Sequence, residues 1–194
     1  MAHASWSWLH RQKYLLRACV LMAGFFLSDS LQSAESSPPR EYQIKAVFLY
    51  NFVQFVEWPP AAFPGPDSPF VIGVLGSDPF GDFLDELVRN EKVNGRPLVV
   101  ERYRSVDEID NCHVLFVSGS ESARAAQIAA DLKGRGILTV CDRDEFARRG
   151  AIVRFVTERD RVRLRVNLEG AKAAGLTISS KLLRSAEIVS SGKD

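Results

Sequence analysis

The stretch of 20 residues from Glu41 to Pro60, EYQIKAVFLYNFVQFVEWPP, constrains the fold of this chain more than any other. Residues 41–56 are predicted to form a helix, which ends near Trp58 because proline disfavours the helical conformation in the residue before it. Apolar side chains occupy most of the helix circumference, so the helix must be buried on several sides or held against a partner. It is too short and too polar to span a bilayer, which requires about 20 apolar residues.

The side chains of this helix support two interpretations, a core element and a docking element. We expect core positions for its aromatic side chains, Phe48, Phe52 and Phe55. A core role does not explain the polar side chains, which are scattered around the helix instead of gathering on one side. We therefore also expect an exposed docking edge for a partner protein, formed by Lys45, Gln54 and Trp58.

The N-terminal residues have the layout of a secretory signal peptide. An apolar run of ten residues, 18–27, follows a positively charged region that contains Arg11, Lys13 and Arg17. We expect cleavage near Ala34, a linker over residues 35–40 and a single domain over residues 41–194, which makes the mature protein periplasmic. The alternative is a cytosolic protein whose N-terminus is disordered or helical.

The charge of the mature chain argues against nucleic acid as a partner. Residues 1–34 contain three basic residues and one acidic residue, so their removal changes the formal charge from +1 to −1. A chain so close to neutral lacks the positive surface that binds a phosphate backbone.

Short apolar runs bounded by turn residues predict strands that are buried on both faces, as in a parallel sheet. These strands are expected at residues 70–76, 98–103, 111–117 and 137–141. Helices are expected between or after them, at about residues 79–91 with Asp78 as the cap, and at residues 121–133 and 143–149. This alternation predicts an α/β fold, a three-layer sandwich with a mainly parallel, Rossmann-like sheet.

The C-terminal part changes to an antiparallel pattern. Residues 151–157 and 160–166 are predicted to form a β-hairpin with residues 158–159 as its loop, so that Phe155 faces Val162 on the apolar side. The apolar and polar faces agree with this register, and a slip of one residue would reverse every side chain. Two helices are predicted after the hairpin, at residues 167–174 and 179–189.

Arginine side chains gather on the polar face of this hairpin. A period of two places Arg161, Arg163 and Arg165 on one face, and the predicted register adds Arg154 opposite Arg163. Like charges directly across a strand pair are destabilising, so acidic groups must offset them. One interpretation is a solvated face balanced by nearby acidic residues; the other is a binding site for an acidic partner.

The sequence lacks the motifs of the common enzyme classes. Residues 76–81 have the glycine spacing of a phosphate-binding loop, but Asp82 and Phe83 replace the lysine and hydroxyl residue that bind phosphate and magnesium. The mature chain has a single histidine, His113, whose neighbour Cys112 points to the opposite face of a strand. We therefore expect no enzyme activity, no metal site and no cofactor, although an active site of carboxylates alone stays open.

The two cysteines of the mature chain are expected to be unpaired. Cys112 begins the third predicted strand and Cys141 ends the fourth, so parallel pairing places their thiols at opposite ends of the sheet. A disulfide requires Cα atoms within about 7 Å of each other.

A series of short motifs resembles the YfiR family of exported bacterial proteins. Lys45 with Asn51-Phe52 and Trp58-Pro59 resembles the opening signature. The later blocks are GVLG (73–76), VNGR (93–96), CHVLF (112–116), LTV (138–140), GAI (150–152), VN (166–167) and SSKLL (179–183). The resemblance covers about residues 41–189, and its specificity lies in the order and spacing of the blocks.

This resemblance implies a periplasmic α/β protein that is often dimeric and is not an enzyme. The family's namesake represses an inner-membrane diguanylate cyclase by binding its periplasmic sensor domain, and an outer-membrane lipoprotein opposes it. The output is cyclic di-GMP control of biofilm and motility. The namesake has more cysteines, in intramolecular disulfides, so the present chain departs from it in Cys112 and Cys141.

Two functions are therefore expected from the sequence. The first is a regulatory protein that docks on the sensor domain of a membrane signalling protein. The alternative is a periplasmic small-ligand binding protein, whose site at the carboxyl ends of the strands would be lined by Ser77, Ser118 and Asp142.

Overall fold

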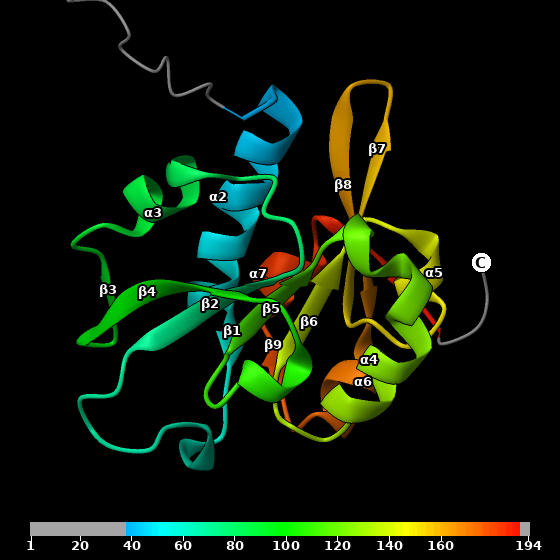
Figure 1. Ribbon diagram of the computed structural model, residues 1–194. Helices are drawn as coiled ribbons and strands as arrows, with labels where there is room; N and C mark the ends of the chain where they lie inside the picture. Colours follow the sequence, from blue (N-terminus) through cyan, green and yellow to red (C-terminus); the bar gives the residue numbers. More distant parts are fainter. Residues whose placement is uncertain (1–37, 191–194) are drawn as a thin grey trace, which may run out of the picture. The chain divides into compact units, whose positions relative to one another are not determined.

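An eight-stranded, mainly parallel sheet organises residues 38–190, the part of the chain that the computed structural model describes (Figure 1). The strand order is β10-β8-β7-β6-β5-β2-β4-β3. The strands are β2 (Phe70–Leu75), β3 (Lys92–Val93), β4 (Arg96–Tyr103), β5 (Val114–Val117), β6 (Leu138–Cys141), β7 (Val153–Glu158), β8 (Arg161–Asn167) and β10 (Ala186–Val189). Within this sheet of the described residues, only the β3–β4 and β7–β8 pairs are antiparallel, which confirms the predicted α/β class with its C-terminal hairpin. The expected signal peptide lies outside the described residues.

Every residue of β2, β5 and β6 is buried, because helices cover both faces of the sheet and make the structure three-layered. One apolar cluster joins the sheet to α2 (Arg40–Phe55), α3 (Asp82–Val88) and α7 (Ser180–Leu183). The other joins the opposite face to α4 (Ala125–Leu132) and α5 (Asp144–Ala147). The remaining elements are α6 (Leu168–Ala173), three short 3-10 turns (Pro60–Ala62, Val106–Glu108, Gly119–Arg124) and the two-stranded pair of β1 (Val56–Glu57) with β9 (Thr177–Ile178).

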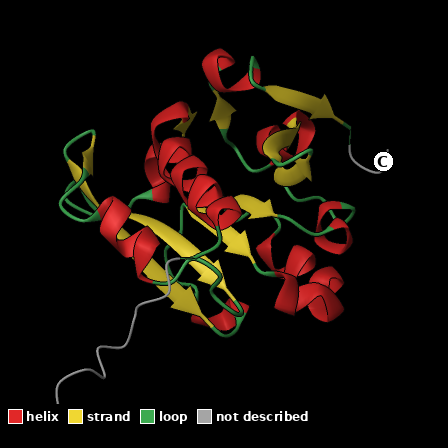
Figure 2. Ribbon diagram, turned by 90° about the horizontal axis from the view of Figure 1, so that it is seen from above, coloured by secondary structure: helices red, strands yellow, loops and turns green. Residues whose placement is uncertain are grey.

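The expected N-terminal helix is α2, which lies across one face of the sheet (Figure 2). Phe52 is fully buried and stacks on Phe155 of β7, with ring centroids 6.1 Å apart. Phe48 and Phe55 are partly buried against the same cluster, so the core interpretation is confirmed for this face. Within residues 38–190, we find no helix that is long and apolar enough to cross a membrane.

The helix after β2 begins later than predicted. The Asp78 carboxylate accepts a hydrogen bond from the Phe80 N–H at 2.7 Å, which forms a turn instead of a helix cap. Gly81 then has φ of +53°, outside the helical region, and α3 begins only at Asp82. The helix predicted over residues 121–133 is likewise divided into a 3-10 turn and the shorter α4.

The predicted C-terminal helix over residues 179–189 is wrong. Only one helical turn, α7, is present, and the chain continues as the edge strand β10, parallel to β8. The backbone N–H and C=O groups on the outer edge of β8 need hydrogen-bond partners, and β10 supplies them. This strand pairing outweighs the weak helical pattern of residues 186–189. An ion pair between Arg165 and Glu187, 3.0 Å long, joins the two strands.

The predicted register of the β7–β8 hairpin is also wrong, by two residues. The loop is Arg159-Asp160, so Phe155 faces Leu164, and Arg154 faces Arg165 instead of Arg163. A shift of two residues keeps every side chain on its face, so the face pattern that excluded a one-residue slip could not exclude this one. The turn decides the register, because both loop residues have positive φ (49° and 61°), as a type I′ turn requires.

We predict that Arg159→Asn with Asp160→Gly will stabilise the protein by about 1 kcal/mol, because these residues favour the left-handed conformation of the turn. Urea denaturation measures the change in the free energy of unfolding. The matched control is Gly95→Ala in the β3–β4 turn, where φ is +81° and an added Cβ meets no atom within 4 Å. That control should lose about 1 kcal/mol, through backbone conformation alone. A loss of stability in the double variant would contradict the assigned turn.

Candidate functional site

Three of the residues singled out in the sequence line one polar cavity, beside the carboxyl end of β6. Lys45, Asp142 and Arg154 lie here, although the sequence assigned them to different sites. The cavity has a volume of about 370 Å³ and is lined by Glu41, Tyr42, Lys45, Asp142, Arg143, Arg154, Phe155, Val156 and Thr157. It therefore joins the first turns of α2 to the β6–α5 connection and to β7.

The Lys45 ammonium is the centre of this site. Its Nζ lies 2.6 Å from an oxygen of Glu41, one helical turn earlier, and 2.6 Å from an oxygen of Asp142. The ammonium also lies 4.4 Å from the centre of the Tyr42 ring, and the Tyr42 hydroxyl donates to Asp142 at 3.1 Å. Two carboxylates and an aromatic face thus replace the water that the buried cation has lost.

The expected exposed docking edge on α2 is therefore wrong for Lys45, which is only 2% exposed. A lysine is buried when acidic partners compensate its desolvation, and Asp142 arrives here from a position 97 residues away in the chain. Gln54 is exposed and Trp58 is half-buried, so the three residues do not form one exposed edge.

The protonation states at this site favour a fixed network over acid–base chemistry. The hydrogen bond from Lys45 lowers the pKa of Glu41 below its usual range. Burial, reinforced by the charge of Asp142, raises the pKa of Tyr42 to about 12, so the hydroxyl stays a neutral donor. Among the described residues, no three His, Cys, Asp or Glu side chains come together as a metal site would require.

The arginines at this site differ in exposure. Arg154 forms an ion pair with Asp144 of α5, and its side chain is 15% exposed. Arg143 is 61% exposed, with its Nε 3.9 Å from Asp142. Arg143 lies across Gly119, where an added Cβ would approach its Nε to 2.8 Å, so the glycine makes room for it.

The expected ligand site at the carboxyl ends of the strands is divided between separate partners. The Ser77 N–H donates to the Ser120 hydroxyl at 2.9 Å, and the Ser118 hydroxyl accepts from the Ser120 N–H at 3.5 Å. Ser120 thus fills the space between the ends of β2 and β5, and a Cβ on Gly76 would collide with it. Asp142 instead bonds to α2, so the three predicted side chains do not converge on a common space.

The arginines of the hairpin share one face, as predicted, but they divide into an inner and an outer pair. The inner pair, Arg154 and Arg165, is directly opposed across the strands, and each has an acidic partner, Asp144 and Glu187. The outer pair, Arg161 and Arg163, is exposed, and the Nε of Arg163 lies 3.4 Å from an oxygen of Glu158, whose side chain is 49% exposed. β10 pairs with β8 only from Leu164 onward, so the outer pair lies beyond that contact, and Figure 1 shows that the outer part of the hairpin stands clear of the neighbouring strands.

Trp58 belongs to an aromatic cluster at the opposite end of the sheet. Its ring meets Phe70 and His113 edge-on, and Phe63 stacks on His113 with ring centroids 4.5 Å apart. The His113 Nδ1 accepts a hydrogen bond from the Val71 N–H at 3.1 Å. Burial lowers the pKa of His113 to about 4, so the imidazole is neutral at pH 7.

The two thiols are free and buried, which confirms that Cys112 and Cys141 form no disulfide with each other. Burial raises the pKa of each to about 12, so neither is a reactive thiolate.

Sequence reasoning missed Glu41, Tyr42, Arg143 and Asp144 as members of the site. The spacing of four between Glu41 and Lys45 was a usable signal, because such a pair meets on one side of a helix. The acidic and basic residues next to Asp142 were a second signal. Tyr42 carried none, because its role depends on where the β6–α5 connection meets α2.

We predict that Lys45→Met will lower the free energy of unfolding by about 3 kcal/mol, since it leaves the Asp142 carboxylate, only 7% exposed, without its counter-charge. Urea denaturation measures this loss, and an NMR titration should show the pKa of Glu41 rising. Lys92→Met is the control, at an exposed lysine, and should change stability by less than about 0.5 kcal/mol. Equal losses in the two variants would show that the buried pair has no special role.

We also predict an acid-sensitive contribution from His113. Its pKa is about 4 in the folded chain and about 6.5 when unfolded, so the unfolded chain takes up the proton first as the pH falls. The free energy of unfolding should therefore drop between pH 6.5 and pH 4, by about 3 kcal/mol from this group, and no further below pH 4. His113→Asn keeps an acceptor for the Val71 N–H and cannot titrate. The difference between the two pH profiles isolates the histidine, and parallel profiles would refute its role.

Comparison with known proteins adds a family. A family model described as YfiR/HmsC-like matches residues 42–187. A search of curated proteins finds no match. Among solved structures, the ABC domain in complex with L-Trp from Streptococcus pneumonia is similar, with a TM-score of 0.46 and 12% sequence identity, over 62% of this chain and 55% of that chain.

Proposed function

This chain belongs to the YfiR/HmsC-like family, and on that premise we propose that it is a periplasmic regulatory protein that docks on the sensor domain of an inner-membrane signalling protein. The partner in this proposal is a diguanylate cyclase, whose cyclic di-GMP output, and with it biofilm formation, the bound protein restrains. The proposal includes export with cleavage near Ala34, an outer-membrane lipoprotein as a second partner and a homodimer. It assigns no catalytic role to the chain.

The exposed outer arginines of the hairpin are the observation that supports this proposal. Arg163 is 62% exposed, and Arg161 lies on the same face, two residues nearer the tip. Exposed charges of this kind speed association and select a partner of opposite charge. The contact on the sensor domain would therefore be acidic.

The inner part of the hairpin supports the same role by holding the outer part in place. Arg154 is tied to Asp144 of α5, and Arg165 is tied to Glu187 of β10, so the base of the hairpin is joined to both neighbouring elements. On the opposite face, the Thr157 hydroxyl donates to Glu41 at 2.9 Å. Binding residues are commonly placed in this way, on a projecting segment that a rigid scaffold orients.

The buried Lys45 site has a positioning role in this proposal. Glu41 contacts both Lys45 and Thr157, so the network that holds α2 against β6 also reaches the hairpin. Of the polar residues first assigned to docking on α2, Gln54 keeps an exposed side chain and Trp58 a partly exposed one. In this proposal these two residues form a second contact region, near the end of α2.

We predict that Arg161→Glu with Arg163→Glu will weaken binding to the partner at least tenfold, because the variant presents negative charge to an acidic surface. The readouts are recovery of a sensor-bearing cyclase from solubilised inner membranes and the cellular level of cyclic di-GMP. Without the protein that level should rise; the wild type should restore it and the variant should not. Binding by the wild type should also weaken as salt is added.

The matched control is Lys92→Glu with Arg184→Glu, which reverses two exposed charges outside the hairpin. This control should bind as the wild type does. If the hairpin variant binds as well as the wild type, Arg161 and Arg163 are not part of the interface. If the wild type recovers no sensor protein, the proposed function itself is wrong.

A further inference from the structure

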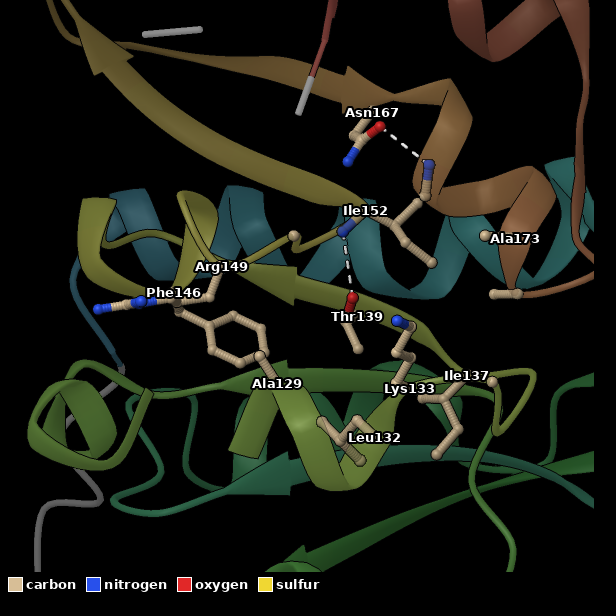
Figure 3. Close-up of a pocket in the computed structure, with 14 residues that line it drawn as sticks. Ala129, Leu132, Lys133, Ile137, Thr139, Phe146, Arg149, Ile152, Asn167 and Ala173 are labelled. Carbon is tan, nitrogen blue, oxygen red and sulfur yellow. Dashed lines mark hydrogen bonds between the residues drawn. The ribbon is translucent and has the colours of Figure 1, made fainter. Parts of the chain in front are cut away.

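A second cavity lies against the face of β6 that is turned away from α2, between α4 and α6 (Figure 3). Its volume is about 360 Å³, within the range of small-molecule sites. It is lined by Ala129, Leu132, Lys133, Gly134, Ile137, Thr139, Phe146, Arg149, Gly150, Ile152, Asn167, Gly170, Ala173 and Ala174. None of these residues is a hairpin arginine or belongs to the Lys45 site, so the cleft has no part in the proposed docking.

The walls of this cleft are apolar, and the space between them exists because the facing helices carry small residues. Leu132, Ile137 and Phe146 line one side, and Ile152 lies across from them (Figure 3). Ala129 on α4 and Gly170 and Ala173 on α6 have no side chains long enough to fill the gap. The mostly apolar lining suits a ligand that loses water from an apolar body on binding.

The floor of the cleft carries a hydroxyl in a defined orientation. The Thr139 Oγ accepts a hydrogen bond from the Ile152 N–H at 3.1 Å, which leaves its own proton available for donation to a ligand. Beside it, the Asn167 side chain accepts from the Gly170 N–H at 2.9 Å and so fixes the first turn of α6 against the floor.

The charged residues that line the cleft are all positive. Lys133 and Arg149 are its only charged lining residues, and no acidic residue lines it. Both side chains are exposed, and neither forms an ion pair with another residue of the described range 38–190. In Figure 3, Lys133 extends toward the middle of the cleft, whereas Arg149 extends outward at one end.

We propose that this cleft binds a small organic carboxylate with an apolar body. The body lies between α4 and α6, and the carboxylate meets the Lys133 ammonium, with the Arg149 guanidinium adding positive charge at the rim. A water molecule takes about 30 Å³ in the liquid, so the cavity corresponds to about twelve groups of that size. That size fits a free carboxylic acid such as octanoate or 3-phenylpropionate.

The test titrates the full mature chain with octanoate and with 3-phenylpropionate, followed by calorimetry and by NMR shifts of Thr139 and Ala173. The uncharged alcohols of the same length, 1-octanol and 3-phenylpropanol, are run beside them. We expect saturable binding of the acids, with Kd at least fivefold lower than for the alcohols. The two acids together show whether the apolar body is preferred as a chain or as a ring.

Three variants locate the binding. Lys133→Glu should raise Kd about fivefold or more, since it replaces attraction by repulsion at an exposed site. Ala173→Leu should abolish binding by filling the cleft, and it should fold because Ala173 is exposed. The control Lys172→Glu reverses a neighbouring charge on α6 that does not line the cleft, and it should bind as the wild type does.

Several results would overturn the proposal. Equal affinity for acids and alcohols, or no effect of Lys133→Glu on Kd, would show that the cleft does not recognise a carboxylate. If none of the four probes binds, the cleft is not a binding site for this class of ligand. A change of oligomeric state in Ala173→Leu would instead identify the cleft as a contact between two copies of the chain. None of these outcomes bears on binding of the hairpin to a sensor domain, because the two surfaces share no residue.

Discussion

The buried ammonium of Lys45 is the interaction on which the arrangement of the site depends. A lysine that is 2% exposed needs opposite charge within a few ångströms, and Glu41 and Asp142 each supply an oxygen at 2.6 Å. Asp142 directly follows β6, so the requirement fixes the N-terminal part of α2 over the carboxyl end of that strand. The aromatic contacts of Phe48 and Phe52 with Phe155 then extend the same attachment to β7.

The attachment of α2 to β6 and β7 also sets the orientation of the hairpin. One of its faces packs on α2 through Phe155 and Thr157, and the other carries the arginines. The inner arginines are joined to acidic residues of α5 and β10, which offsets the repulsion between Arg154 and Arg165. Only the outer arginines are left to meet another molecule. Balance by acidic residues therefore describes the base of the hairpin, where Arg154 and Arg165 are 15% and 26% exposed, and the partner-binding interpretation is left for its outer half.

Local patterns in the sequence predicted well wherever the physical cause was also local. The continuous apolar runs of β2, β5 and β6 follow from burial on both faces, and α2 begins directly after a proline, Pro39. The free thiols followed from strand direction alone. The prediction of the hairpin register failed because the alternation of apolar and polar residues carries no information on a shift of two residues. The turn itself gave no signal, because arginine does not favour the positive φ that Arg159 adopts beside Asp160.

The sequence by itself thus determined the α/β class, the parallel strands, the faces of the hairpin and the family to which the chain belongs. Tertiary structure alone decided that Lys45 is buried, that Asp142 bonds to α2 instead of joining Ser77 and Ser118, and that residues 186–189 form a strand. The reason is common to all three. Each outcome depends on a partner that is distant in the chain, such as a carboxylate 97 residues away or the open edge of β8, and no local pattern records such a partner.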